Sequence, residues 1–195
     1  MEITTNQIKD LRDKTGVSVM QCKKALEEAG GDMEKAIMVL QKNSKATALK
    51  KTERTLGSGV VQAYLHSTGS VGVLVELMCE TDFVAKNEDF KKLAYDIAMH
   101  IAAADPQYLS KEDIGADAIK SAEEIFAQDI EGKPEELKSK IMEGKLASYF
   151  GERTLLDQPY VKNPDITIRG LIEGAVQKFG EKTEIGRFAR FSTKK

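Results

Sequence analysis

The chain has 195 residues, of which 41% are hydrophobic and 31% charged, and its formal net charge is -2. This composition is typical of a globular chain and excludes a wholly disordered one. The slightly acidic balance argues against direct binding of nucleic acid. No run approaches the ~20 apolar residues of a membrane helix, and the first four residues do not resemble a signal peptide. We therefore expect a cytoplasmic protein with no membrane contact.

The sequence carries no motif of catalysis, cofactor binding or metal binding. Cys22 and Cys79 are the only cysteines, and their places on predicted buried faces indicate two reduced core thiols. His66 and His100, the only histidines, have no nearby cysteine with which to bind a metal. A glycine-rich phosphate loop, a nucleophile elbow and an HExxH sequence are all missing. We expect a protein that is not an enzyme and needs no cofactor and no metal.

Residues 1–44 predict a module of three short helices. Residues 4–7 and 18–21 fit capping boxes, and Asp32 can cap the third helix. Behind each cap, apolar residues recur at helical spacing: Ile8 and Leu11, then Cys22, Ala25, Leu26 and Ala29, then Met33, Ala36, Ile37 and Leu40. This architecture resembles the ubiquitin-associated domain, a resemblance that suggests protein binding without naming the partner.

Residues 45–56 are basic and poor in large apolar side chains. We interpret them as a linker that can be partly helical. An RNA- or phosphate-binding strip ranks lower, because no aromatic side chains interleave with the basic ones to stack on bases.

Residues 57–195 predict a core of strands and helices. Alternating apolar residues indicate strands at 61–65 and 71–79, joined by the turn residues 67–70 into a hairpin. Helices are expected over about 87–103, with Asn87 as a candidate cap, and over 168–179, before a last strand at 184–191. The fold class is therefore α+β, with a small three-stranded antiparallel sheet packed by helices.

Residues 110–150 predict an insertion into this core. One amphipathic helix can start at Asp117 and a second after Pro134, with charged residues outside a thin apolar stripe. Two such helices around a tight turn indicate an antiparallel helical hairpin. The thin stripe leaves part of the hairpin available to a partner. After it, residues 155–164 are expected to return to the core in an extended conformation.

The junction between the second strand and the next helix, residues 80–86, contains an unusual side chain. Phe83 is large and apolar, yet it lies between Asp82 and a polar run at 86–89. A loop held by rigid elements is a common place for binding residues. From this stretch alone we favour a Phe83 that folds over the core, because most aromatic side chains are buried. The alternative is an exposed wedge for another protein's pocket.

Five stretches in order resemble elongation factor Ts, the nucleotide-exchange factor of the translation GTPase elongation factor Tu. Each is weak alone, but the ordered set is specific and covers nearly the whole chain. Longer members carry two related sheet-bearing subdomains, so this chain is similar to the short, single-subdomain form. The stretches are Leu11-Arg12-Asp13-Lys14-Thr15-Gly16, Cys22-Lys23-Lys24-Ala25-Leu26, Thr81-Asp82-Phe83-Val84, Ile97-Ala98-Met99-His100, and Gly151-Glu152 through Pro159-Tyr160.

The resemblance implies release of GDP from elongation factor Tu, which the chain would bind in both its GDP-bound and its nucleotide-free state. Phe83 would insert between helices of the GTPase domain and disturb its Mg²⁺ and phosphate site. Three groups of residues would share the contact. They are Asp82 beside Phe83 within the motif that Thr81 and Val84 complete, Met99 with His100 as a second contact, and Leu11, Arg12, Val19 and Met20 as the docking face of the N-terminal module.

Blander readings stand beside these roles. Met20 can pack in the core, His100 can be a polar residue at a helix end, and Arg12 can be a solvated charge. The second contact belongs to a different subdomain in longer members, so we expect two chains to pair as a homodimer. The main alternative function is a non-enzymatic protein-binding adaptor, with a ubiquitin-associated-like module and a dimerising core. A small-molecule enzyme would need a pocket with convergent polar groups.

Overall fold

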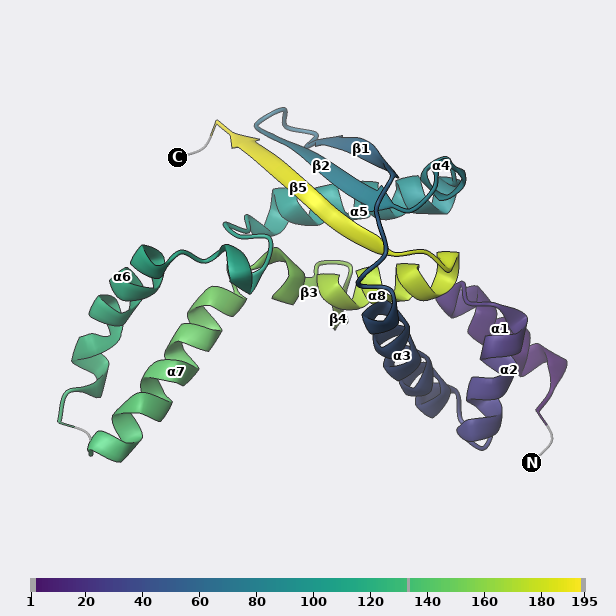
Figure 1. Cartoon of the computed structure of the whole chain (residues 1–195), viewed down its shortest axis with the longest axis horizontal. Helices are drawn as coiled ribbons and strands as arrows, with labels where there is room; N and C mark the ends of the chain where they lie inside the picture. The colour runs from purple at the N-terminus through teal and green to yellow at the C-terminus, as the bar shows by residue number, and fades with distance from the viewer. Residues whose placement is uncertain (1–2, 133, 194–195) are drawn as a thin grey trace. The chain divides into compact units, whose positions relative to one another are not determined.

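The computed structural model describes residues 3–132 and 134–193 (Figure 1). It confirms the α+β fold class. The three-stranded sheet has the order β1-β2-β5, formed by β1 (Ser58–Leu65), β2 (Val71–Cys79) and β5 (Thr183–Ser192). By its internal contacts the chain divides into two compact units. The first holds residues up to 62, 76–94 and 169–186, and the second holds 63–75, 95–168 and those from 187 onward.

The N-terminal helices belong to the first unit and are α1 (Thr5–Thr15), α2 (Val19–Glu28) and α3 (Met33–Lys50). The side chains of Thr4, Ser18 and Asp32 each accept a hydrogen bond from a backbone N–H at the start of the helix that follows, as the sequence predicts. Their apolar faces meet in one core, made of Leu11, Val17, Cys22, Ala25, Leu26, Ala36 and Leu40. Helix α3 continues to Lys50, so much of the basic segment is helical.

Strand β2 buries every second side chain from Val73 to Cys79, which is the alternation that the sequence predicts. Helix α4 (Asp82–Ala85) follows at once, and then α5 (Glu88–Ala104). In the first unit, Phe90 of α5 packs edge-to-face on Phe179 of α8 (Ile168–Phe179), with ring centroids 5.7 Å apart. Cys22 and Cys79 are buried free thiols, as expected.

The predicted helical hairpin lies in the second unit. Helices α6 (Ala116–Phe126) and α7 (Glu135–Gly151) run side by side, and the 3₁₀-helix η2 (Ala127–Ile130) follows α6 (Figure 1). The rings of Phe126 and Tyr149 pack edge-to-face between the two helices, with their centroids 5.6 Å apart. Lys133, within the predicted break, lies outside the described residues. The apolar stripe is thin, because Ile125 and Leu137 are exposed.

Two stretches differ from the prediction. Residues 155–164 are not a simple extended return: they contain the 3₁₀-helix η3 (Leu155–Asp157) and β3 (Pro159–Tyr160), which pairs antiparallel with β4 (Asn163–Thr167). Before the hairpin there is a further 3₁₀-helix, η1 (Lys111–Asp113). The second difference is α4, because the junction after β2 is a helical turn and not a loop.

No helix in the described ranges is long and apolar enough to cross a membrane.

Candidate functional site

Helix α4 presents Phe83 to solvent. The side chain of Phe83 is 80% exposed, whereas Val84 and Ala85 next to it are buried. Thr81 fixes the start of the helix, since its hydroxyl accepts the backbone N–H of Val84 at 3.5 Å. Neighbouring residues of a helical turn point in different directions, so burying Val84 and Ala85 turns Phe83 outward. The interpretation of Phe83 as a core residue, which the local stretch alone favours, is therefore wrong, and the ring is exposed as the alternative expects.

Charged and polar groups surround this exposed ring. Asp82 and Lys86 form an ion pair at 2.5 Å across one turn, and the hydrogen bond from Lys86 lowers the pKa of the Asp82 carboxyl. Asp82, Phe83, Lys86 and Asn87 line an open hollow on the surface. An aromatic anchor with a polar rim is typical of a protein-binding hot spot.

Within the described residues, no cluster of His, Cys, Asp and Glu could hold a metal ion.

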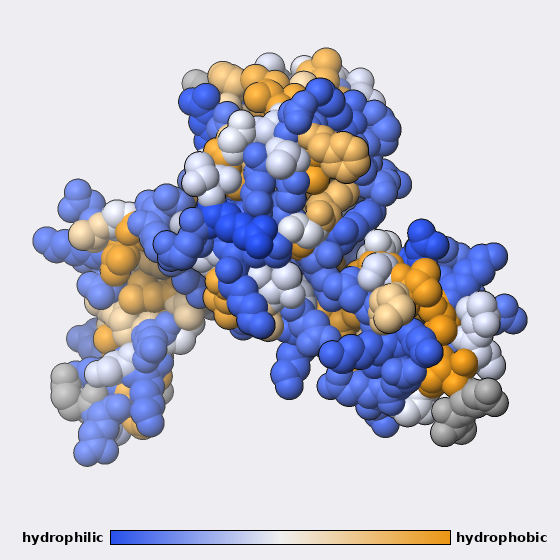
Figure 2. Space-filling view, turned by 45° about the vertical axis from the view of Figure 1, so that its right-hand side comes forward, coloured by the Kyte–Doolittle hydropathy of each residue, from blue (hydrophilic) through white to orange (hydrophobic). Residues whose placement is uncertain are grey.

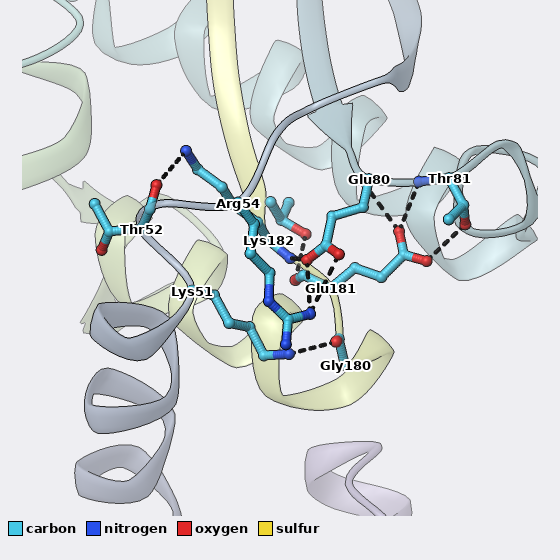
Figure 3. Close-up of polar contacts among 9 residues, drawn as sticks. Lys51, Thr52, Arg54, Glu80, Thr81, Gly180, Glu181 and Lys182 are labelled. Atoms are coloured by element: carbon cyan, nitrogen blue, oxygen red, sulfur yellow. Dashed lines mark hydrogen bonds and ion pairs between the residues drawn. The ribbon is translucent and has the colours of Figure 1, made fainter.

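Segment 180–182, which follows α8, is hydrogen-bonded to the junction between β2 and α4 (Figure 3). The Glu80 carboxylate accepts the backbone N–H of Lys182 at 2.5 Å and pairs with Arg54 at 3.2 Å. These contacts, the Lys182 N–H above all, lower the pKa of Glu80. The Glu181 carboxylate binds residues 80 and 81 in return. These residues are about a hundred positions from α4 in sequence, and no local pattern pointed to them.

The N-terminal module, which belongs to the first unit, also exposes predicted site residues. Met20 is 76% exposed, and Val19 and Arg12 are exposed as well, so Met20 is not a core residue. Figure 2 shows hydrophobic surface among hydrophilic side chains on this module, at the right. Leu11, by contrast, is fully buried in the module's core. It can shape the docking face from within but offers no surface to a partner.

Lys178 lies between the module and the helix that follows α4. Its side chain packs against Gly16, at the end of α1. Its ammonium group pairs with Asp89 in the first turn of α5 at 2.8 Å. Ser44 of α3 donates a hydrogen bond to Gln177, the preceding residue of α8. Helix α8 therefore contacts both the N-terminal module and the first turn of α5.

His100 lies in the second unit and is fully buried. Its Nδ1 accepts the backbone N–H of Val161 at 3.3 Å, which leaves Nε2–H to donate to Gln158 Oε1 at 2.9 Å. Burial lowers the pKa of this imidazole, and the hydrogen bond with Gln158 acts against that change. In this conformation His100 holds residues 158–161, and only the partly buried Met99 beside it has surface to offer.

Comparison with known proteins agrees with the motif-based resemblance. The family described as Elongation factor TS matches residues 2–195. Elongation factor Ts of Carboxydothermus hydrogenoformans is 51% identical over 191 residues, 97% of this chain and 88% of that protein. Elongation factor Ts of Thermodesulfovibrio yellowstonii is 50% identical over 192 residues, covering 98% and 96% of the two chains. The chain thus belongs to the elongation factor Ts family of translation elongation factors.

Proposed function

We propose that the chain is a guanine-nucleotide exchange factor that releases GDP from elongation factor Tu. The observation that carries the proposal is Phe83, 80% exposed on a capped helical turn within the family motif. A rigid aromatic side chain in this setting suits insertion into a partner. Placed between helices of the GTPase domain, it would displace them and disturb the Mg²⁺ and phosphate contacts that retain GDP.

This activity needs no covalent chemistry. The factor binds both the GDP-bound and the nucleotide-free partner, and it prefers the nucleotide-free state. By linkage, the nucleotide and the factor then weaken each other's binding by the same factor. A coupling of about 3 kcal/mol already changes both affinities roughly a hundredfold. The factor does not select GDP or GTP, so the cellular nucleotide ratio sets the direction of exchange.

The remaining predicted residues take roles that match their exposure. Asp82 orients the contact beside Phe83, while Arg12, Val19 and Met20 dock the N-terminal module on the GTPase domain. The buried Leu11 and Val84 hold those exposed residues in place. We assign His100 a positioning role in the second contact region, with Met99 nearer the surface.

We further propose that two chains pair as a homodimer. Strands β1 and β5 are the edges of the sheet, and unpaired edges favour association. Leu65, Leu74 and Phe191, one on each strand, are exposed apolar side chains within the second unit. Light scattering at working concentration tests this pairing, and a monomer with full exchange activity would overturn it.

The exchange function is tested by stopped-flow release of fluorescent GDP from elongation factor Tu, with and without the chain. We expect strong acceleration by the wild type and a loss of roughly 30-fold in Phe83→Ala, the rate equivalent of about 2 kcal/mol for a hot-spot residue. Leu49→Ala is the matched control, because Leu49 is an exposed apolar residue of α3 outside the proposed contact.

Each outcome separates the candidate functions. Unchanged GDP release by a folded Phe83→Ala would refute the wedge. If the wild type binds an active partner without accelerating release, the adaptor alternative stands and the exchange function falls.

A further inference from the structure

The carboxylate of Glu181 receives three hydrogen bonds from the junction that leads into α4 (Figure 3). Its Oε2 accepts the backbone N–H of Glu80 at 3.1 Å and that of Thr81 at 3.0 Å. Its Oε1 accepts the hydroxyl of Thr81 at 2.6 Å. Hydrogen bonds to an ionised acceptor are the stronger kind. Here they converge on the two residues that precede the exposed Asp82 and Phe83.

The hydroxyl of Thr81 links Glu181 to the first turn of α4. A hydroxyl has one hydrogen to donate and two lone pairs that accept. Because Thr81 donates its hydrogen to Glu181, a lone pair is left to accept the N–H of Val84 and cap the helix. Glu181 thereby fixes the rotation of the cap, and with it the direction in which the helix carries Phe83.

Hydrogen bonds between residues 80–81 and residues 181–182 run in both directions, and we call this set of contacts the clamp. Gly180 ends α8 with φ +72°, a left-handed conformation that reverses the chain and that glycine adopts without strain. The reversal brings Glu181 and Lys182 to the junction, where Glu80 accepts the N–H of Lys182. Lys51 of the segment after α3 donates to the Gly180 carbonyl at 2.6 Å. The junction is therefore bound to an element that is itself anchored.

We infer that Glu181 is a positioning residue for nucleotide exchange, which acts by holding Thr81 and α4 so that Phe83 is presented in one orientation. This inference rests on the proposed exchange function and deepens it. Phe83 is largely solvated and has few contacts of its own to set its direction, so its orientation follows from its backbone. A wedge that must enter a partner loses effectiveness when its base is free to move, because ordering it then costs entropy.

The test compares Glu181→Ala and Glu181→Gln with the wild type in GDP release, measured over a range of factor concentrations. We expect Glu181→Ala to lower the maximal rate about tenfold, the effect of losing hydrogen bonds to a charged acceptor. Glu181→Gln should be intermediate, because its amide oxygen can still accept the two backbone N–H groups. Glu184→Ala is the matched control, because it removes the same charge from an exposed side chain three residues further along. Glu184 pairs with the ammonium group of Lys182, whereas the clamp uses the backbone N–H of Lys182, so this variant should leave the rate unchanged.

Two further readouts distinguish positioning from a general loss of structure. With Phe83→Ala already present, Glu181→Ala should have little additional effect on the rate; two independent losses that multiply would overturn the inference. Amide hydrogen exchange in the free chain should be faster at residues 80, 81 and 84 in Glu181→Ala and unchanged in Glu184→Ala. Unchanged protection at those amides would also overturn it. A wild type without exchange activity would instead refute the proposed function, while the hydrogen-exchange result would still report on the clamp.

Discussion

Replacing His100 by alanine separates a structural role of this side chain from a contact with the partner. The substitution leaves the N–H of Val161 and the side-chain oxygen of Gln158 without the ring nitrogens that they now meet. Each unsatisfied buried group costs about 1–3 kcal/mol, and the cavity left by the ring adds to that. We expect His100→Ala to lower the free energy of unfolding by about 3 kcal/mol.

Urea denaturation followed by circular dichroism near pH 7.5 measures this loss. His66→Ala is the matched control, because His66 is exposed and its ring lies beside the nearby Tyr64; we expect a change within about 0.5 kcal/mol there. The reasoning is refuted if His100→Ala unfolds at the wild-type urea concentration. If that stable variant also lost exchange activity, His100 would be a contact residue after all.

Two more predictions follow from individual sites. Burial lowers the pKa of His100 below the ordinary 6.5, so the unfolded chain binds the proton more readily: this contribution to stability is full above pH 6.5 and falls as the pH drops toward the lowered pKa. Urea midpoints from about pH 8 to 5 should show the fall in the wild type and in His66→Ala but less of it in His100→Ala; parallel curves for all three would contradict it. Gly59→Ala should cost about 1–3 kcal/mol, because its Cβ would lie 2.5 Å from the backbone carbonyl oxygen of Leu77. Gly72→Ala is the control, with a first contact at 3.6 Å, and equal urea midpoints for the two variants would show that β1 shifts freely.

The sequence predicted the regular part of the fold well. The three N-terminal helices begin at side chains that cap them, and β2 alternates from Val73 to Cys79. These features are local, since a cap or an alternation is complete within a few residues. The β3–β4 pair was missed, because β3 has only two residues and β4 contains one aliphatic residue, Ile166, so neither strand shows an alternating pattern. Helix α4 was missed for a similar reason, as a single turn has no repeating pattern.

The candidate site could be predicted only in part. The residue types around Phe83 were identified through the family resemblance, but local reasoning favoured a buried ring. What decides the direction of Phe83 is the burial of Val84 and Ala85 and the hydrogen bonds that Thr81 donates to Glu181, which depend on tertiary structure. His100 shows the opposite case. Its position in the motif suggested a contact, while the helix periodicity also places it on the side of α5 that is buried beside Ile97 and Ile101.

The free energy that burial of the Phe83 ring provides can be compared with the coupling free energy that nucleotide exchange requires. Burying a phenylalanine side chain provides about 1.5–3 kcal/mol, which is the range of a typical coupling between two sites. One ring can therefore supply the coupling, provided that its pocket opens only when the nucleotide-binding helices are displaced. A contact made equally well in the GDP-bound partner would strengthen binding and shift nothing. We therefore expect Phe83→Ala to weaken binding to nucleotide-free elongation factor Tu about tenfold or more while changing binding to the GDP-bound form much less. Calorimetric titration of the two forms measures this difference, and an equal loss of affinity for both would show that Phe83 anchors the complex without driving nucleotide release.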